Sequence, residues 1–187
     1  MASAARRLIT VDEFLTLEFS GEEGLRVELD NGVISMMAGG NLRHARIQRN
    51  LIGRLFMALQ GSGCGPFGSD VGVRTHDLSL RYPDVSILCG HEEDESDGLY
   101  EINDPRAVFE ILSPSTHRID LDVKLREYCS TSSLEAIVYI DPEAETVRML
   151  SRRADRGWDD AELNSGEKLV LSAFGVSLSW LEIFARS

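Results

Sequence analysis

A strand, a helix and a second strand follow one another in the second half of the chain, and this unit most constrains the fold. The segments Val108 to Leu112 and Leu134 to Ile140 are short apolar runs of the length of buried strands. Between them, "HRIDLDVKLREYC" (117–129) repeats apolar residues at helical spacing. Strands joined through a helix run parallel, with a right-handed crossover in nearly all proteins. We therefore expect a mixed sheet in which these two strands run parallel.

The N-terminal part predicts a helix and a hairpin. Residues 10–13, "TVDE", have the form of a capping box and predict a helix over 11–19, with Val11, Phe14 and Leu15 facing the core. The dipeptide Asn31-Gly32 predicts a tight turn between two alternating segments, because both residues tolerate positive φ. The remaining patterns predict a long helix over "NLRHARIQRNLIGRLFMALQ", strands near 71–73 and at "DVSIL", further β structure after "DPEAE", and a short terminal helix at "SWLEIFAR". A mixed sheet flanked by helices is the natural packing of this order.

Composition places the chain among ordinary globular proteins. The 187 residues, 43% hydrophobic and 27% charged, predict one domain spanning residues 1–187. The net charge of -12 argues against a protein that coats nucleic acid nonspecifically, although a nuclease with an acidic, cation-binding site stays compatible with it. Much of the excess lies in "HEEDESDG" (91–98), which predicts a solvated loop.

The cysteines and the apolar runs bear on location. Cys64, Cys89 and Cys129 are odd in number and far apart, so we expect neither a disulfide framework nor a zinc site, which suits a reducing cytoplasm. No apolar run approaches the about 20 residues that span a membrane, and "MASAARRLIT" lacks the apolar core of a secretory signal. We therefore expect a cytoplasmic protein without a membrane partner.

A glutamate, Glu110, interrupts the apolar strand "VFEIL", and burying an unpaired carboxylate costs several kcal/mol. Asp84 stands at the head of another apolar strand. If the two strands are neighbours, the carboxylates repel each other unless a cation lies between them. Mg²⁺ selects oxygen ligands and takes one or two carboxylates plus waters and phosphates. A purely structural role stays open for both acids. Glu110 would then lie at a sheet edge or pair with an Arg or Lys, and Asp84 would belong to a Pro-Asp turn.

Several segments together are more specific. "RYPDVSIL" (81–88), "AVFEILSPST" (107–116) and "DLDVKLREY" (120–128) resemble, in order and spacing, the Uma-type family of restriction endonucleases in the PD-(D/E)XK nuclease superfamily. The likeness covers most of the chain, from "VELDNGVISMM" through "RHARIQRNLIGRL" to "YIDPEAETVRML". It implies a restriction-endonuclease-like α/β (α+β) fold, a mixed β-sheet flanked by helices. It also implies Mg²⁺-dependent hydrolysis of DNA, with Mn²⁺ as a substitute ion.

The resemblance also implies site residues. Asp84 matches the aspartate of the superfamily motif, Glu110 its second acid, and Glu28 an additional glutamate of these sites. Asp84 and Glu110 would hold the metal with the backbone carbonyl of Ile111, while Glu28 would complete the cluster or bind a second ion. The superfamily lysine belongs two residues after the second acid, where this chain has Leu112.

Lys124, on the following helix, is the expected replacement, which would orient the attacking water or stabilise charge on phosphorus. A helix that packs back over the sheet lets such a long side chain reach the carboxylates. The alternative is a surface pair with Asp120 worth about 0.3–0.5 kcal/mol. His44 and Tyr128 are predicted as packed residues rather than site residues.

Two functions compete. The first is a Mg²⁺-dependent DNA endonuclease, for which a homodimer would suit two-fold symmetric duplex cleavage. The second is a catalytically inactive nuclease fold that binds nucleic acid or protein, favoured by the acidic net charge and by Leu112. The three acids favour the first, because a module without metal chemistry gains little from converging carboxylates. A glycoside hydrolase with paired carboxylates is disfavoured by the aromatic content of 7%.

Overall fold

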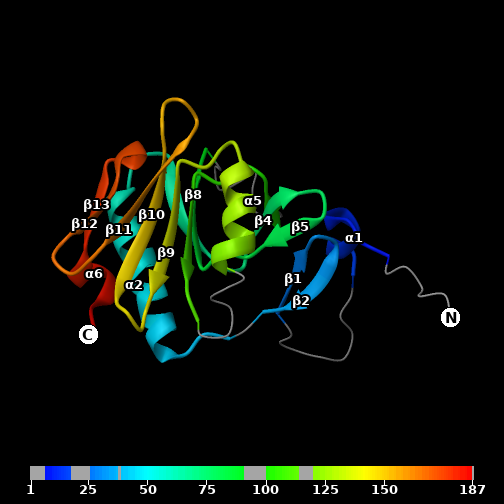
Figure 1. Ribbon diagram of the computed structural model, residues 1–187, viewed down its shortest axis with the longest axis horizontal. Coiled ribbons are helices and arrows are strands. Elements are labelled where there is room, and N and C mark those ends of the chain that lie inside the picture. Colours follow the sequence, from blue (N-terminus) through cyan, green and yellow to red (C-terminus); the bar gives the residue numbers. More distant parts are fainter. Residues whose placement is uncertain (1–6, 18–25, 38, 91–99, 114–119, 187) are drawn as a thin grey trace.

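A computed structural model of the chain describes residues 7–17, 26–37, 39–90, 100–113 and 120–186, with the backbone alone at 120 and 121. The strands form a six-stranded sheet in the order β11-β10-β9-β8-β6-β3, a five-stranded sheet in the order β2-β1-β5-β4-β7, and the pair β12-β13 (Figure 1). The chain thus has the mixed α+β architecture that the sequence predicts, with its strands divided over more than one sheet.

The strands of the six-stranded sheet are β3 Cys64–Gly68, β6 Val85–Cys89, β8 Ala107–Ile111, β9 Ala136–Asp141, β10 Thr146–Arg152 and β11 Trp158–Leu163. β8 and β9 run parallel, with Glu110 opposite Tyr139, which confirms the predicted parallel pair. β6 lies antiparallel against the other side of β8, with Val85 opposite Phe109. The strand that follows Asp84 directly, β6, is therefore a neighbour of the strand that carries Glu110, β8.

Alternating residues of the central strands build two separate cores. Val85, Phe109 and Val138 pack on one face, together with a buried stripe of helix α2 (Leu42–Ala58) and its C-cap residue, namely Ile47, Leu51, Leu55 and Leu59. Val108, Ile137 and Tyr139 pack on the other face, together with Tyr128 of helix α5 (Leu125–Ser130). The two faces follow from the period of two residues in a strand. Because β8 is covered on both sides, all five of its residues are buried, including Glu110.

The five-stranded sheet consists of β1 Val27–Asp30, β2 Val33–Met36, β4 Gly72–His76, β5 Ser79–Arg81 and β7 Glu101–Ile102. β1 and β2 form the predicted hairpin, and Asn31 and Gly32 adopt φ of 48° and 77° at its turn. Residues 82–84 then connect β5 of this sheet to β6 of the larger one. This connection places Asp84 between the two sheets, which lie side by side in Figure 1.

The first helix is shorter than predicted. The capping box between Thr10 and Glu13 is present, but α1 (Val11–Leu15) ends at Leu15, and residues 18 and 19 lie outside the described part. Val11 and Phe14 are buried as expected, whereas the prediction of a core-facing Leu15 is wrong, because this side chain is exposed. One and a half turns of helix have room for only two inward positions.

Beyond residue 113, the chain is described again from residue 120 onward. This part begins as a π-helix, η1 (Asp120–Lys124), and continues directly as α5. The wider turn departs from the plain α-helix that the apolar spacing predicts. Lys124 is the last residue of the wide turn, and Tyr128 follows on α5. The predicted acidic loop 91–98 lies outside the described residues.

The C-terminal part caps one face of the larger sheet. β12 (Lys168–Leu171), the 3₁₀ turn η2 (Ser172–Phe174) and β13 (Val176–Ser179) lead into helix α6 (Trp180–Phe184), which packs against α2. Among the described residues, no helix combines the length and the apolar character needed to cross a bilayer.

The cysteine prediction is wrong for two of the three residues. Cys64 and Cys89 stand directly opposite each other on β3 and β6 and form a disulfide. Their separation of 25 residues hid this pairing, because strand register, not sequence spacing, brings them together. Cys129 is a free thiol. The cysteines therefore no longer support a reducing compartment.

Candidate active site

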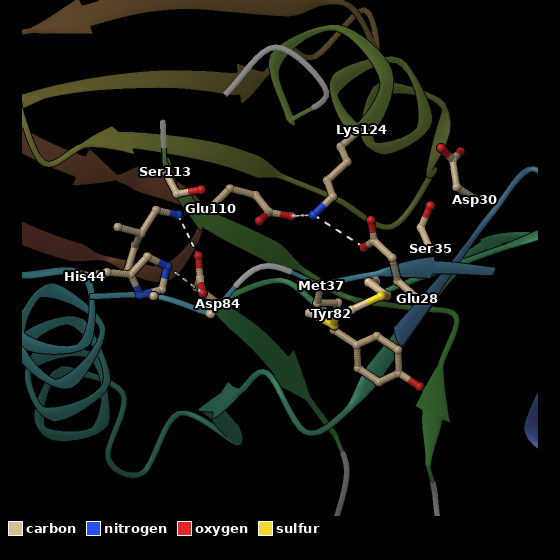
Figure 2. A pocket seen from close by; sticks show the side chains of 14 residues that line it. Glu28, Asp30, Ser35, Met37, His44, Tyr82, Asp84, Glu110, Ser113 and Lys124 are labelled. Atoms are coloured by element: carbon tan, nitrogen blue, oxygen red, sulfur yellow. Dashed lines mark hydrogen bonds and ion pairs between the residues drawn. The ribbon is translucent and has the colours of Figure 1, made fainter. Parts of the chain in front are cut away.

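The acids and the lysine proposed from the sequence line one pocket of about 110 Å³ between the two sheets (Figure 2). Its wall includes the side chains of Glu28, Asp84, Glu110 and Lys124, together with Ile111 and His44. The residues come from elements far apart in the sequence, namely β1, the connection before β6, β8, η1 and α2. The structure thus brings all the predicted site residues together.

Asp84 is held on both carboxylate oxygens. Its Oδ2 accepts a 2.7 Å hydrogen bond from the backbone N–H of Ile111, which fixes it against the end of β8. Its Oδ1 lies 3.1 Å from Nε2 of His44. Gln48 of α2 donates a 2.8 Å hydrogen bond to the backbone carbonyl of Asp84. These contacts aim the carboxylate into the pocket and tie it to the N-terminal half of α2.

A glycine makes room for the histidine beside Asp84. A Cβ atom on Gly40 would lie 2.6 Å from Cγ and Nδ1 of the His44 ring, closer than any such contact is tolerated. The ring therefore depends on a residue without a side chain at position 40. The prediction that His44 is merely a packed residue is incomplete, because its ring also contacts Asp84.

Glu110 is 4% exposed and is held by a tyrosine. The hydroxyl of Tyr128 donates a 2.7 Å hydrogen bond to Glu110 Oε1. Burial raises the pKa of Tyr128 well above its usual value, and the neighbouring charge of Glu110 raises it further, so the hydroxyl stays protonated and stays a donor. Tyr128 is a core residue, as predicted, and in addition it orients the central acid of the site.

Glu28 is held by an arginine that the sequence reading missed. The guanidinium of Arg81 is fully buried and lies 3.1 Å from Glu28 Oε1, 2.6 Å from Asp30 Oδ1 and 2.7 Å from Glu127 Oε2. Burial alone would lower the pKa of Arg81, but the Glu127 hydrogen bond and the charges of the three acids outweigh it and hold the pKa above its usual value. Arg81 thus remains charged inside the protein.

The position of Arg81 in the sequence, just before Tyr82-Pro83-Asp84, was the only sequence signal for its role. Arg81 ends the short strand β5, all of whose residues are buried. A buried charge of this kind requires partners, and Glu127 supplies both of its oxygens to the guanidinium. The partner could not be identified from the sequence, because Glu127 lies 46 residues away on another element.

Lys124 stands between two of the acids. Its ammonium nitrogen lies 3.4 Å from Glu110 Oε1 and 3.5 Å from Glu28 Oε2, and only 6% of the residue is exposed. These contacts place the lysine in the pocket rather than on the surface. Its position on the helix after β8 is the one expected for a replacement of the lysine missing at Leu112.

The donor set fits a hard divalent cation. Asp84, just before β6, and Glu110, on the neighbouring β8, present two carboxylates to one pocket. Mg²⁺ usually takes one or two carboxylates, together with waters and phosphates. Glu28 Oε2 is buried and accepts no hydrogen bond from any described residue. However, within the described ranges no three His, Cys, Asp or Glu side chains are close enough together to hold a single ion. Glu28 is separated from Glu110 by the Lys124 ammonium, so it belongs to the pocket but not to a three-acid cage.

Comparisons with known proteins agree with this fold. Residues 11–181 match the model of the Uma2 family, whose description is "Putative restriction endonuclease". An uncharacterised protein of Synechocystis sp. (strain PCC 6803) is 26% identical over 172 residues, which cover 91% of this chain and 88% of that protein. A crystal structure of a "putative nuclease belonging to DUF820" from Anabaena variabilis superposes with a TM-score of 0.76 at 20% identity, over 95% of this chain and 98% of the other.

The solved structure shows a shared fold, and the family match covers nearly the whole length of the described chain, including every element that lines the pocket. The sequence resemblance and the structural neighbour thus agree on the fold. The chain belongs to the Uma2 family.

Proposed function

We propose that the protein is a Mg²⁺-dependent endonuclease that hydrolyses phosphodiester bonds of DNA, with Mn²⁺ as an alternative ion. The observation that carries the proposal is the meeting of Asp84, Glu110 and the Lys124 ammonium in one pocket. Acids for a hard cation and a buried cationic donor are the groups that phosphodiester hydrolysis needs. The family and the nuclease fold of the solved neighbour support the same reaction class.

In this proposal Asp84, Glu110 and the backbone carbonyl of Ile111 hold the cation. When bound, the cation supplies Lewis-acid stabilisation of the phosphate and activates water. The protein's own part is orientation. Ile111 N–H and His44 fix Asp84, and the Tyr128 hydroxyl fixes Glu110.

Lys124 has the catalytic role of a charge-stabilising donor. Its ammonium is buried, and a buried donor interacts with a phosphate more strongly than one in water. When substrate and cation enter, the ammonium exchanges its contacts with Glu110 and Glu28 for a phosphate oxygen. It then stabilises the negative charge that develops on phosphorus.

Glu28 has a supporting role in the same proposal. One of its oxygens is fixed by Arg81, while Oε2 faces Lys124. It would tune the position of the lysine, or complete the acidic cluster around a second ion. We also propose a homodimer, because two-fold symmetry suits the cleavage of duplex DNA. A cytoplasmic location stays a prediction.

Cleavage of supercoiled plasmid tests the proposal. With Mg²⁺ or Mn²⁺ the wild type should produce nicked and linear DNA, and chelation of the ion should stop the reaction. Asp84→Asn and Glu110→Gln should lower the rate at least about 100-fold, the loss typical for removal of a group that stabilises the transition state. Asp159→Asn, at an exposed acid of β11, is the matched control and should cleave like the wild type.

The inactive-module alternative makes a different prediction. If the wild type binds Mn²⁺ and DNA but leaves plasmid, linear duplex and single-stranded DNA intact, the fold serves binding alone. Cleavage that is equal in the wild type and the Asp84→Asn variant would show that the activity belongs to a contaminant or to another site.

A further inference from the structure

We propose that one exposed face of α2 binds the sugar-phosphate backbone of duplex DNA and leads it to the pocket. This surface, the arginine face, consists of Leu42, Ala45, Arg46, Arg49 and Arg186. The inference rests on the proposed function and adds to it the surface that holds the substrate. Nothing in the catalytic pocket itself requires these side chains.

The charge of α2 is opposite to that of the chain. The chain has a net charge of -12, whereas the 17 residues of this helix contain four arginines and no aspartate or glutamate. Two of the arginines, Arg43 and Arg54, lie beside Glu143 and Glu182 on the flanks of the helix. Arg46 and Arg49 lie on the side opposite the buried stripe of Ile47, where Arg49 donates to Asn50 Oδ1. No carboxylate among the described residues pairs with Arg46.

The arginines surround a hollow of a kind that suits a phosphate chain. It measures about 370 Å³, and its described lining contains three arginines and two small or apolar residues. One of the three, Arg186, pairs with Glu145 outside the lining, at 3.0 Å. A second hollow of about 620 Å³ lies across Ala45 and Arg49, and its lining includes Arg26. Asp70 is the acid of that second lining, where it lies 3.8 Å from Arg26. Arginine is well suited to phosphate, because its planar guanidinium offers paired donors.

Helix α2 links the arginine face to the catalytic pocket. Helix α2 carries His44, whose Nε2 lies 3.1 Å from Asp84 Oδ1, one residue before Ala45. Gln48 donates to the backbone carbonyl of Asp84 and also lines the second hollow. A DNA backbone that runs from Arg46 and Arg49 into this second hollow therefore comes within one side chain, Gln48, of the main chain at Asp84. Figure 2 shows the N-terminal end of this helix beside Asp84.

DNA fits this surface better than a second copy of the chain does. A two-fold contact pairs each surface with itself, so the arginine face would meet the arginines of its copy. Like charges placed against each other disfavour such a contact. The phosphate backbone has the opposite charge, and its counterions are released when arginines replace them.

Fluorescence anisotropy with a labelled 30-base-pair duplex DNA tests the inference. All binding variants carry Asp84→Asn so that the duplex is not cut. Addition of Arg46→Gln and Arg49→Gln should weaken binding about tenfold or more. The slope of log K against log salt should become shallower by about two, because each lost phosphate contact contributes about 0.9.

Matched variants separate charge from fold. Arg148→Gln with Arg153→Gln removes the same number of arginines from β10 and its following turn, and should leave both affinity and slope unchanged. Arg46→Lys with Arg49→Lys keeps the charge and should keep the slope. In the otherwise wild-type chain, the Gln pair should raise KM for plasmid cleavage with little change in kcat, and Mn²⁺ binding should not change.

The outcomes distinguish this inference from the proposed function. If the wild type cleaves DNA but the Gln pair retains its affinity and slope, the arginine face is wrong while the nuclease stands. If the wild type neither binds nor cleaves DNA, both are wrong. If the Gln pair instead converts a dimer to a monomer in sedimentation velocity, the face is an interface between copies and the inference is overturned.

Discussion

The ammonium nitrogen of Lys124 lies 3.4 Å from Oε1 of Glu110, although the two residues are on different elements and 14 positions apart. The nuclease superfamily pattern expects the lysine on the same strand, where this chain has Leu112. The helix that follows β8 supplies the cation instead. Leu112 is thereby free to pack in the core beside Tyr128. Lys124 places its positive charge in the pocket from this helix, so the pocket contains a lysine although position 112 is a leucine.

Lys124→Met should separate folding, metal binding and catalysis. Loss of the lysine leaves Glu28 with Arg81 and Glu110 with the Tyr128 hydroxyl but removes the buried charge between the two acids, which should destabilise the metal-free protein by about 3 kcal/mol. Mn²⁺ should then bind about tenfold more tightly, because no ammonium competes, and should raise Tm more than in the wild type. Cleavage should fall about 100-fold.

Lys168→Met is the matched control for this experiment, since Lys124 and Lys168 are the only lysines and Lys168 is exposed on β12. Calorimetric titration and thermal melting with and without Mn²⁺ make the comparison. Weaker Mn²⁺ binding in Lys124→Met than in Lys168→Met would contradict the competition between ammonium and metal.

Arg81→Met should be among the most destabilising single changes in this chain. It leaves Glu127 with no guanidinium, and Glu28 and Asp30 lose a shared partner. Breaking a buried pair in this way costs about 3–5 kcal/mol. Urea unfolding should show a lower midpoint at an unchanged slope. Arg153→Met, at an exposed ion pair, should change stability by less than about 1 kcal/mol, and an equally small change at Arg81 would refute the account of the buried cluster.

Tyr128→Phe should change how stability depends on alkaline pH. The folded protein holds the Tyr128 proton more tightly than the unfolded chain, because its pKa is raised by burial and by Glu110. Its contribution is therefore complete below about pH 10, the unfolded pKa, and is lost as the pH rises above it. Tyr128→Phe should make this alkaline decline shallower, and should cost about 1–3 kcal/mol at neutral pH because Glu110 loses its donor.

Urea unfolding between pH 7 and 11 checks the result. The control is Tyr100→Phe, since Tyr100 is an exposed tyrosine whose change should leave the profile as in the wild type. An identical alkaline slope in Tyr128→Phe and the wild type would show that Tyr128 does not carry the linkage.

The Cys64–Cys89 disulfide should contribute about 3 kcal/mol by closing a loop of 25 residues in the unfolded chain. Cys64→Ser with Cys89→Ser should lose this amount, and reductant should have no further effect on that variant. Cys129→Ser should retain the full stability. Thiol titration of the denatured, unreduced wild type should detect one thiol, and three reactive thiols would contradict the pairing.

The sequence was sufficient for the central strands, because apolar period and length are local. The strand pair around Glu110, the hairpin at Asn31-Gly32 and the buried stripe of α2 were all predicted from patterns within a few residues. The early end of α1 at Leu15 was missed, because apolar spacing alone does not mark where a helix ends.

Parts of the site depend on tertiary register, and these the sequence could not provide. Arg81 pairs with Glu127, which lies 46 residues away in the sequence. Cys64 and Cys89 form a disulfide because the pairing of two strands brings them together. The contact between His44 and Asp84 likewise requires α2 to pack over β6. The acids themselves were accessible to sequence reasoning, because a carboxylate inside an apolar strand stands out against its neighbours.

The most direct test of the central claim is the position of a bound ion. A crystal of the protein grown or soaked with Mn²⁺ should show an anomalous peak in the pocket, about 2.1 Å from a carboxylate oxygen of both Asp84 and Glu110, with the Lys124 ammonium moved away from Glu110. A pocket that stays without a peak at saturating Mn²⁺, with Lys124 still against Glu110, would contradict the metal-dependent nuclease.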